Sequence, residues 1–119
     1  MIPVKLSPIL VLAALALAGC ANDPAPTEQM RLTTQAVEQA RAVGADAAIE
    51  EMHLAEKKLA RAEKNMGEED YKRARQLAEQ AELDARLAEA KVLNQKSRKQ
   101  LDEMNARIVR LRKQLGEMP

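Results

Sequence analysis

The sequence has few of the residues from which globular cores and active sites are usually built. Its 119 residues include one Tyr, no Phe, no Trp, one Cys and one His. An enzyme needs several convergent catalytic groups in a pocket, so this composition predicts a protein with no enzymatic activity, cofactor or metal. The hydrophobic share of 46% is carried mainly by 22 Ala residues. We therefore expect the chain to bury small side chains rather than aromatic ones.

The first twenty residues differ in composition from the rest of the chain. Lys5 is their only charged residue, and residues 9–18 form an unbroken apolar run. A helix that crosses a bilayer needs about 20 apolar residues, roughly twice this length. The segment 1–19 is therefore predicted to be a cleaved signal peptide.

The apolar run ends in Leu17-Ala18-Gly19-Cys20, which resembles the bacterial lipobox. The resemblance implies that a signal peptidase recognises Leu17, Ala18 and Gly19. It also implies that Cys20 carries a diacylglycerol and an N-acyl chain such as palmitate, which would anchor the protein to a membrane without spanning it. The alternative is an isolated thiol or half of an intermolecular disulfide. Because Ala21, not Asp, follows the Cys, the resemblance implies the periplasmic face of the outer membrane.

The first predicted helix covers residues 28–66. Residues 20–27, before it, are Pro-spaced and typical of a flexible tether. The segment 28–66 has no Pro and one Gly, and it is rich in helix-forming residues. Its apolar residues recur at spacings of four and three on one face: Ala48, Met52, Ala55, Leu59, Ala62 and Met66. Near Gly44 the stripe shifts by one residue, which we interpret as a slight unwinding of a continuous helix.

The second predicted helix covers residues 70–116, after a turn at 67–69 that Gly67 closes in the left-handed conformation. Its first half carries a second stripe: Ala74, Ala78, Ala81, Ala85 and Ala88. Two Ala stripes around one turn predict an all-α fold, an antiparallel Ala-rich two-helix hairpin with coiled-coil-like packing and a longer second helix. In this hairpin Ala36 would face Leu101, and the C-terminal end would return towards the membrane.

The second helix carries a further apolar stripe, of which the last three residues project past the expected reach of the first helix: Leu101, Met104, Ile108, Leu111 and Leu115. This spacing predicts a coiled-coil interface with a second copy of the chain or with another envelope protein. From residue 91 to 119, eight basic residues stand against three acidic ones. This basic end suits either a solvated coiled-coil face or contact with anionic head groups. Without Lys5 the acidic and basic totals are equal, so no global charge favours nucleic acid.

Residues 35–93 resemble a family of bacterial envelope lipoproteins known as domain of unknown function 4398. The matching residues are Gly44-Ala45, Leu59-Ala60-Arg61-Ala62 and the segment from Tyr71-Lys72-Arg73-Ala74 to Ala85-Arg86-Leu87-Ala88. The resemblance implies an envelope location and no assigned reaction. The chain also resembles small murein lipoproteins, but it ends in Glu117-Met118-Pro119 instead of their wall-linked Lys. Any contact with peptidoglycan is therefore expected to be non-covalent.

Two functions stay open on these grounds. The first is an outer-membrane lipoprotein with a structural or adaptor role, acting through a helical hairpin and coiled-coil contacts. The alternative is a module that binds peptidoglycan or a peptide non-covalently. A single hairpin lacks the concave surface that stacked helical repeats form, which favours the first function.

Overall fold

The computed structural model describes residues 23–116. This part of the chain folds into three helices without a strand: α2 (Thr27–Ala42), α3 (Glu50–Gly67) and α4 (Tyr71–Gln114). The prediction of an all-α fold is confirmed. The predicted signal peptide, the lipobox residues and Cys20 lie outside the described residues.

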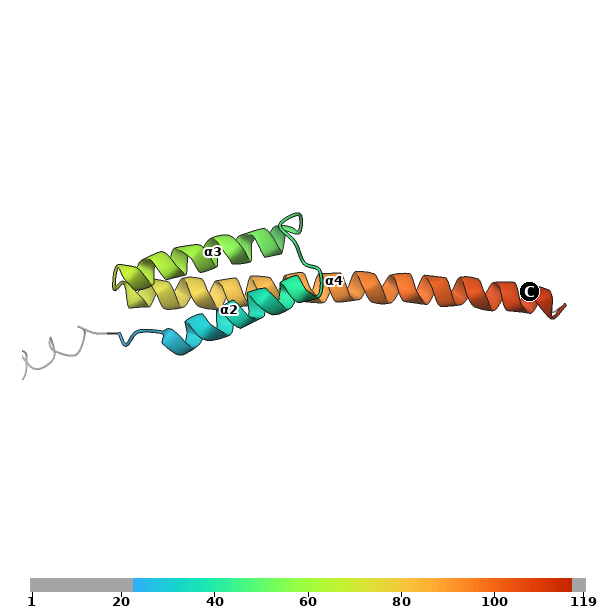
Figure 1. The fold of residues 1–119 in the computed structure, drawn as a ribbon, viewed down its shortest axis with the longest axis horizontal. Helices are drawn as coiled ribbons and strands as arrows, with labels where there is room; N and C mark the ends of the chain where they lie inside the picture. Colours follow the sequence, from blue (N-terminus) through green and yellow to red (C-terminus); the bar gives the residue numbers. More distant parts are fainter. Residues whose placement is uncertain (1–22, 117–119) are drawn as a thin grey trace, which may run out of the picture.

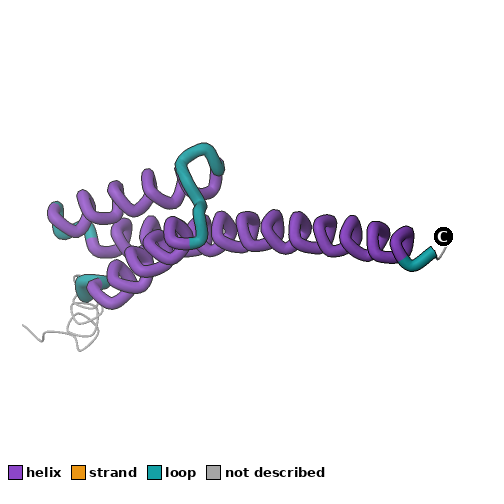
Figure 2. The backbone as a smooth tube through the Cα atoms, turned by 45° about the vertical axis from the view of Figure 1, so that its right-hand side comes forward, coloured by secondary structure: helices purple, strands orange, loops and turns teal. Residues whose placement is uncertain are grey.

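The helices run up, down and up, with α4 at the centre. α4 has 44 residues, which corresponds to about 66 Å at ~1.5 Å per residue. α3 runs antiparallel to its N-terminal half and α2 parallel to it (Figure 1). The C-terminal half of α4 extends past both shorter helices, and beyond Lys96, which contacts Val43 at the end of α2, no described segment lies beside it (Figures 1 and 2).

The core is a narrow seam of Ala side chains on α4. Its fully buried members are Ala74, Ala78, Ala81, Ala85 and Ala88, which the sequence predicted as a stripe. α3 contributes Met52, Ala55 and Ala62, and α2 contributes Ala36, Val37 and Ala40. Because these side chains are short, the helices can approach near the lower end of the usual ~8–10 Å range. The expectation that the chain buries small side chains rather than aromatic ones is confirmed for α3 and α4.

The prediction of one continuous helix over residues 28–66 is wrong, because α2 ends before a loop at 43–49. Gly44 has a φ of 101°, which a residue with a side chain adopts only with strain. The amide of Ala45 donates to the carbonyl of Ala40 at 2.9 Å. This bond and the left-handed Gly form a Schellman ending. The shift of the apolar stripe is therefore a helix end rather than a local unwinding.

The loop that follows is closed by Asp46. Its carboxylate accepts a hydrogen bond from the amide of Ala48 at 2.9 Å, which is the geometry of an Asx turn. Ala48 itself is exposed, so its predicted place in the packed stripe is wrong. The side chain of Asp46 satisfies a loop amide that a continuous helix would have bonded to a carbonyl.

This additional reversal changes the direction of α2. Thr33 of α2 lies beside Ala78 near the start of α4, so the predicted facing of Ala36 with Leu101 is wrong. The C-terminal end of α4 lies at the opposite end of the molecule from the start of α2 (Figure 1). The expectation that this end returns to the side where the first helix begins is wrong for the same reason, because the additional helix reverses the chain once more.

The turn between α3 and α4 is closed by Glu69, not by Gly67 as predicted. Glu69 has a φ of 61°. The amides of Glu69 and Asp70 donate to the carbonyls of Met66 and Asn65 at 3.2 and 2.9 Å, which is a second Schellman ending. The Asp70 side chain then accepts a hydrogen bond from an amide in the first turn of α4. Gly67 is an ordinary last residue of α3, with open space around its Cα.

Replacing Gly44 or Gly67 by Ala is expected to change stability in opposite directions. Gly44→Ala places a Cβ in the left-handed region and should lower the free energy of unfolding by about 1–2 kcal/mol. Gly67→Ala adds a helix-forming residue in open space and should raise it by up to about 1 kcal/mol. Urea unfolding followed by far-ultraviolet circular dichroism measures both. A stabilised Gly44→Ala variant would contradict the left-handed ending of α2.

Larger side chains in the Ala seam are expected to destabilise the fold. Ala85→Leu should lower the free energy of unfolding by about 1–3 kcal/mol, because the added atoms force the packed helices apart. Ala60 is exposed on α3, and Ala60→Leu should stay within about 0.5 kcal/mol of the parent. Thermal unfolding of the two variants tests this contrast, and equal effects would argue against close packing at Ala85.

Candidate partner-binding surface

Residues 93–116, which we call the distal segment, form the part of α4 and its end that stands apart from the bundle. Every residue of the distal segment is exposed, and Val92 is the last buried residue of α4. The five residues predicted as an interface all lie here, with relative exposures between 44% and 75%: Leu101, Met104, Ile108, Leu111 and Leu115. The structure thus brings them together on one unaccompanied helix, and their role as an interface stays a prediction.

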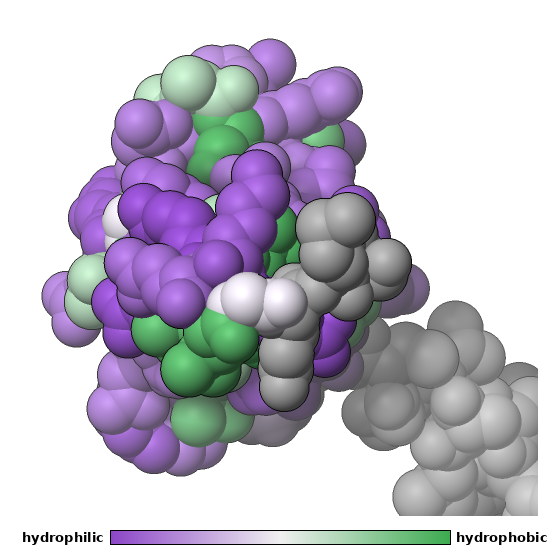
Figure 3. All heavy atoms as spheres, turned by 90° about the vertical axis from the view of Figure 1, so that its right-hand side faces the viewer, coloured by the Kyte–Doolittle hydropathy of each residue, from purple (hydrophilic) through white to green (hydrophobic). Residues whose placement is uncertain are grey.

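The five side chains form one stripe rather than a scatter. Spacings of three and four follow the ~3.6 residues per helical turn, so successive members lie above one another on the same face. Viewed along α4 from its C-terminal end, hydrophobic atoms reach the surface on one side of the front, with hydrophilic atoms around them (Figure 3). An apolar row with polar borders is typical of a surface that meets another helix.

The bundle holds α4 on both flanks, up to the first turn of the distal segment. On the α3 side, Lys58 Nζ lies 2.6 Å from Asp84 Oδ2, and the two side chains are only 26% and 20% exposed. On the α2 side, Lys96 Nζ donates to the carbonyl of Val43 at 2.6 Å. A cation is favoured there because a helix C-terminus carries partial negative charge. The distal segment is therefore the free end of a helix clamped by its neighbours.

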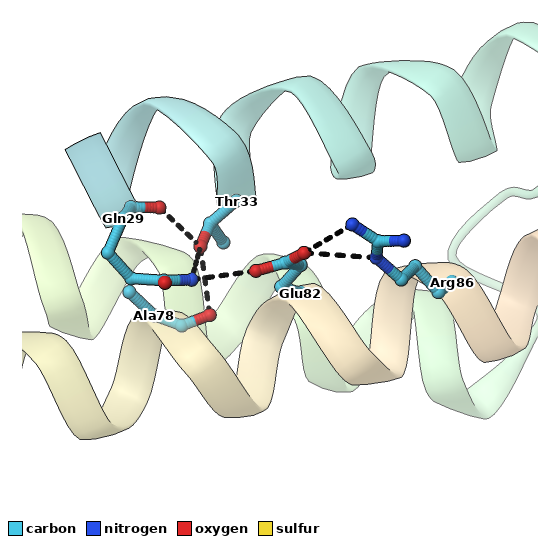
Figure 4. A network of polar contacts seen from close by, with 5 residues as sticks. All are labelled: Gln29, Thr33, Ala78, Glu82 and Arg86. Atoms are coloured by element: carbon cyan, nitrogen blue, oxygen red, sulfur yellow. Dashed lines mark hydrogen bonds and ion pairs between the residues drawn. The ribbon is translucent and has the colours of Figure 1, made fainter.

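A polar network between α2 and α4 was not predicted from the sequence (Figure 4). Thr33 is buried, and its Oγ1 lies 2.9 Å from the carbonyl oxygens of both Gln29 and Ala78. Gln29 Nε2 donates to the carboxylate of Glu82 at 2.7 Å, and Arg86 donates to the same carboxylate. The hydrogen bond from Gln29, followed by that from Arg86, holds the pKa of Glu82 below its ordinary value of 4.5. The network fixes the position of α2 along α4.

The spacing of Thr33 was the signal that could have revealed this network. Thr33 stands three residues before Ala36 and seven before Ala40, so all three share a helix face. A hydroxyl on a buried face needs a hydrogen-bond partner. A Thr in an Ala stripe therefore indicates a polar contact across the seam.

Charge is distributed unevenly along the rod. The distal segment contains seven Lys or Arg residues against two acidic ones, whereas residues 23–92 contain fifteen acidic against eleven basic ones. A rod keeps these two regions apart in space, so their opposite net charges are not averaged. The distal segment offers an apolar stripe with basic borders, which suits a partner of acidic character.

The described part of the chain offers no comparable site elsewhere. Between residues 23 and 116 no three His, Cys, Asp or Glu side chains are placed to hold a metal ion. His53 is exposed on α3. A small groove between α2 and α4 is lined by Leu32, Gln35, Ala36, Gln39, Arg86 and Glu89. Over the same residues, none of the helices combines the length and the apolarity needed to cross a bilayer.

Comparison with known proteins gives one family and one similar structure. The profile described as "Domain of unknown function (DUF4398)" matches residues 28–104, which span α2, α3 and most of α4. The crystal structure of a DUF4398 family protein from Pseudomonas aeruginosa PAO1 is 64% identical, covers 79% of this chain and 98% of its own, and has a TM-score of 0.77. No curated protein matches the chain.

The Glu82 network is expected to make the stability of the fold depend on pH in the acidic range. Because the pKa of Glu82 is lowered in the folded state, its contribution is present above the ordinary value near 4.5. The contribution is lost as the pH falls through the lower, folded pKa. Glu82→Gln should therefore lose less stability than the parent between pH 6 and pH 3, as measured by thermal unfolding in a pH series.

Glu79→Gln is the control for this experiment, since Glu79 is exposed on the same helix. Its pH dependence should follow that of the parent. A Glu82→Gln variant with an unchanged acid slope would show that the network does not favour the charged carboxylate.

Proposed function

Since this chain belongs to the DUF4398 family, a family of unknown function, we propose that it acts as a lipid-anchored structural or adaptor protein of the bacterial envelope. The observation that carries this proposal is the distal segment, an exposed helical segment with an apolar stripe. It extends from a helix whose N-terminal half is held in place by α2 and α3. Apolar side chains in a regular row are costly to leave in water. A helical partner that covers the stripe is the simplest role for such a surface.

The proposed anchor is Cys20, acylated after cleavage behind Gly19. Support comes from the Leu17-Ala18-Gly19-Cys20 motif and the apolar run before it. Within the predicted tether, the carbonyl of Pro24 accepts a hydrogen bond from Arg75 at 3.2 Å. The described part of the chain therefore begins beside the start of α4. Ala21 favours the outer membrane and its periplasmic face.

In this proposal the anchor and the partner surface lie at opposite ends of the molecule. From Arg75 to Gln114, α4 rises by roughly 60 Å at ~1.5 Å per residue, and the start of α2 lies at the near end of that span (Figure 1). The role we propose is non-enzymatic. The bundle holds α4 in a fixed position, and the distal segment binds the partner. The sparse supply of His and Cys in the sequence supports this role.

Lipidation is tested with Cys20→Ser and Ala21→Asp variants of the full chain in a diderm bacterium. The parent should incorporate labelled palmitate and fractionate with the outer membrane. Cys20→Ser should lose the label, because the thiol that takes the lipid is gone. Ala21→Asp should keep the label and move to the inner-membrane fraction. A Cys20→Ser chain that still takes the label and floats with membranes would refute the anchor.

A further inference from the structure

The apolar stripe does not begin with the distal segment but continues back over the bundle. Leu83 and Leu87 lie on the bundled part of α4, yet they are 68% and 49% exposed. Leu83 and Leu101 are 18 residues apart, which is about five helical turns, so they share one side of α4. Ala90, Asn94 and Ser97 fill the positions between and are exposed. The outer stripe is therefore Leu83, Leu87, Ala90, Asn94, Ser97, Leu101, Met104, Ile108, Leu111 and Leu115.

The outer stripe lies away from the seam that α2 and α3 cover. Ala85 and Ala88 are fully buried. Leu83 and Leu87, which are close to them in sequence, point to solvent. The spacing of three and four persists over residues 83–115, nearly five heptads, with Asn94 and Ser97 as polar positions near its centre. A polar residue at a core position of a coiled coil fixes the register at a cost in stability. Because the bundle leaves this face open, the whole length of the outer stripe is available to a partner helix.

The outer stripe is complementary to itself when its direction is reversed. In an antiparallel pair of copies whose overlap is centred near residue 99, five pairs of residues would face each other: Leu83 with Leu115, Leu87 with Leu111, Ala90 with Ile108, Asn94 with Met104, and Ser97 with Leu101. At both ends Leu meets Leu, and in the middle each large side chain meets a small or polar one. Alternation of large and small residues is how facing helices fill the space between them.

Charge selects the antiparallel arrangement over the parallel one. A parallel pair would align two distal segments, each with seven basic and two acidic residues, and like charges at this density repel. The antiparallel pair instead overlaps the two distal segments only over residues 93–105, where Lys96 of one copy lies opposite Asp102 of the other. It places residues 106–116, with four basic and no acidic residues, beside residues 82–92 of the other copy, which hold three acidic and two basic ones. The second copy therefore supplies acidic residues to the C-terminal half of the distal segment.

We propose that a second copy of this chain docks antiparallel along the outer stripe, with Leu87 of one copy against Leu111 of the other. This inference rests on the proposed function, because it names the partner that the distal segment would bind. In the pair, the two starts of α4 lie at opposite ends, about 80 Å apart at ~1.5 Å of rise per residue. The two proposed anchors would then hold the pair at both ends.

A photoreactive residue placed at position 111 of the full chain, in cells, tests the pairing. Irradiation and mass spectrometry should give an adduct to the residues around Leu87. Within one chain these positions are separated by about 36 Å of helix, so this adduct can form only between copies. A probe at Ala106, which is exposed and on the other side of α4, should give no such adduct. An adduct to residues around Leu111, an adduct to a different protein alone, or none at all would each overturn the proposal.

A charge-pair rescue tests the contact between Leu87 and Leu111 directly, with the photoreactive residue at position 108. Leu87→Glu and Leu111→Lys should each lower the adduct to residues around Ala90 by about tenfold or more, because each pair loses two apolar contacts. The double variant should recover most of the yield, since Glu would face Lys. Failure of the double variant to recover would overturn the proposed pairing. Palmitate labelling of these variants should stay normal, so failure of pairing is distinguished from failure of the proposed anchor.

Discussion

The contact between methyl groups along the Ala seam of α4 is the interaction on which the rest of the structure depends. Because five seam residues from Ala74 to Ala88 are fully buried yet small, two helices can rest on adjacent sides of one central helix. Ala buries little apolar area, so each contact contributes little on its own. The ion pair of Lys58 with Asp84 and the hydrogen bonds of Thr33 reinforce the seam. The bundle is held by many weak contacts rather than by a bulky core.

The helix end at Gly44 determines which way the molecule points. If residues 28–66 formed one helix, the chain would be a hairpin with both ends on one side. The left-handed Gly44 instead adds a reversal, so α2 and α4 run in the same direction and the chain ends far from where its described part begins (Figure 1). One backbone conformation thus sets the distance between the proposed anchor and the distal segment.

The narrow bundle also explains why apolar side chains stay exposed on α4. Two helices cover the seam of α4, which lies opposite Leu83 and Leu87, so neither helix reaches the outer face where these two residues lie. A third helix on that face would complete the apolar packing along the whole of α4. The opposite net charges of the bundle and the distal segment make a second, reversed copy the natural source of that helix.

The sequence by itself determined the helical class, the Ala stripes of α3 and α4, the turn near residue 68 and the stripe from Leu101 to Leu115, because these follow from local periodicity and propensity. The family was visible in the same local patterns. Only the tertiary structure decided that α2 is a separate helix, that Thr33 meets Ala78, and that Leu83 belongs to the outer stripe. These features depend on which side of α4 each neighbour covers. A helix pattern specifies which residues share a face, but the partner of each face is set by the path of the chain between helices.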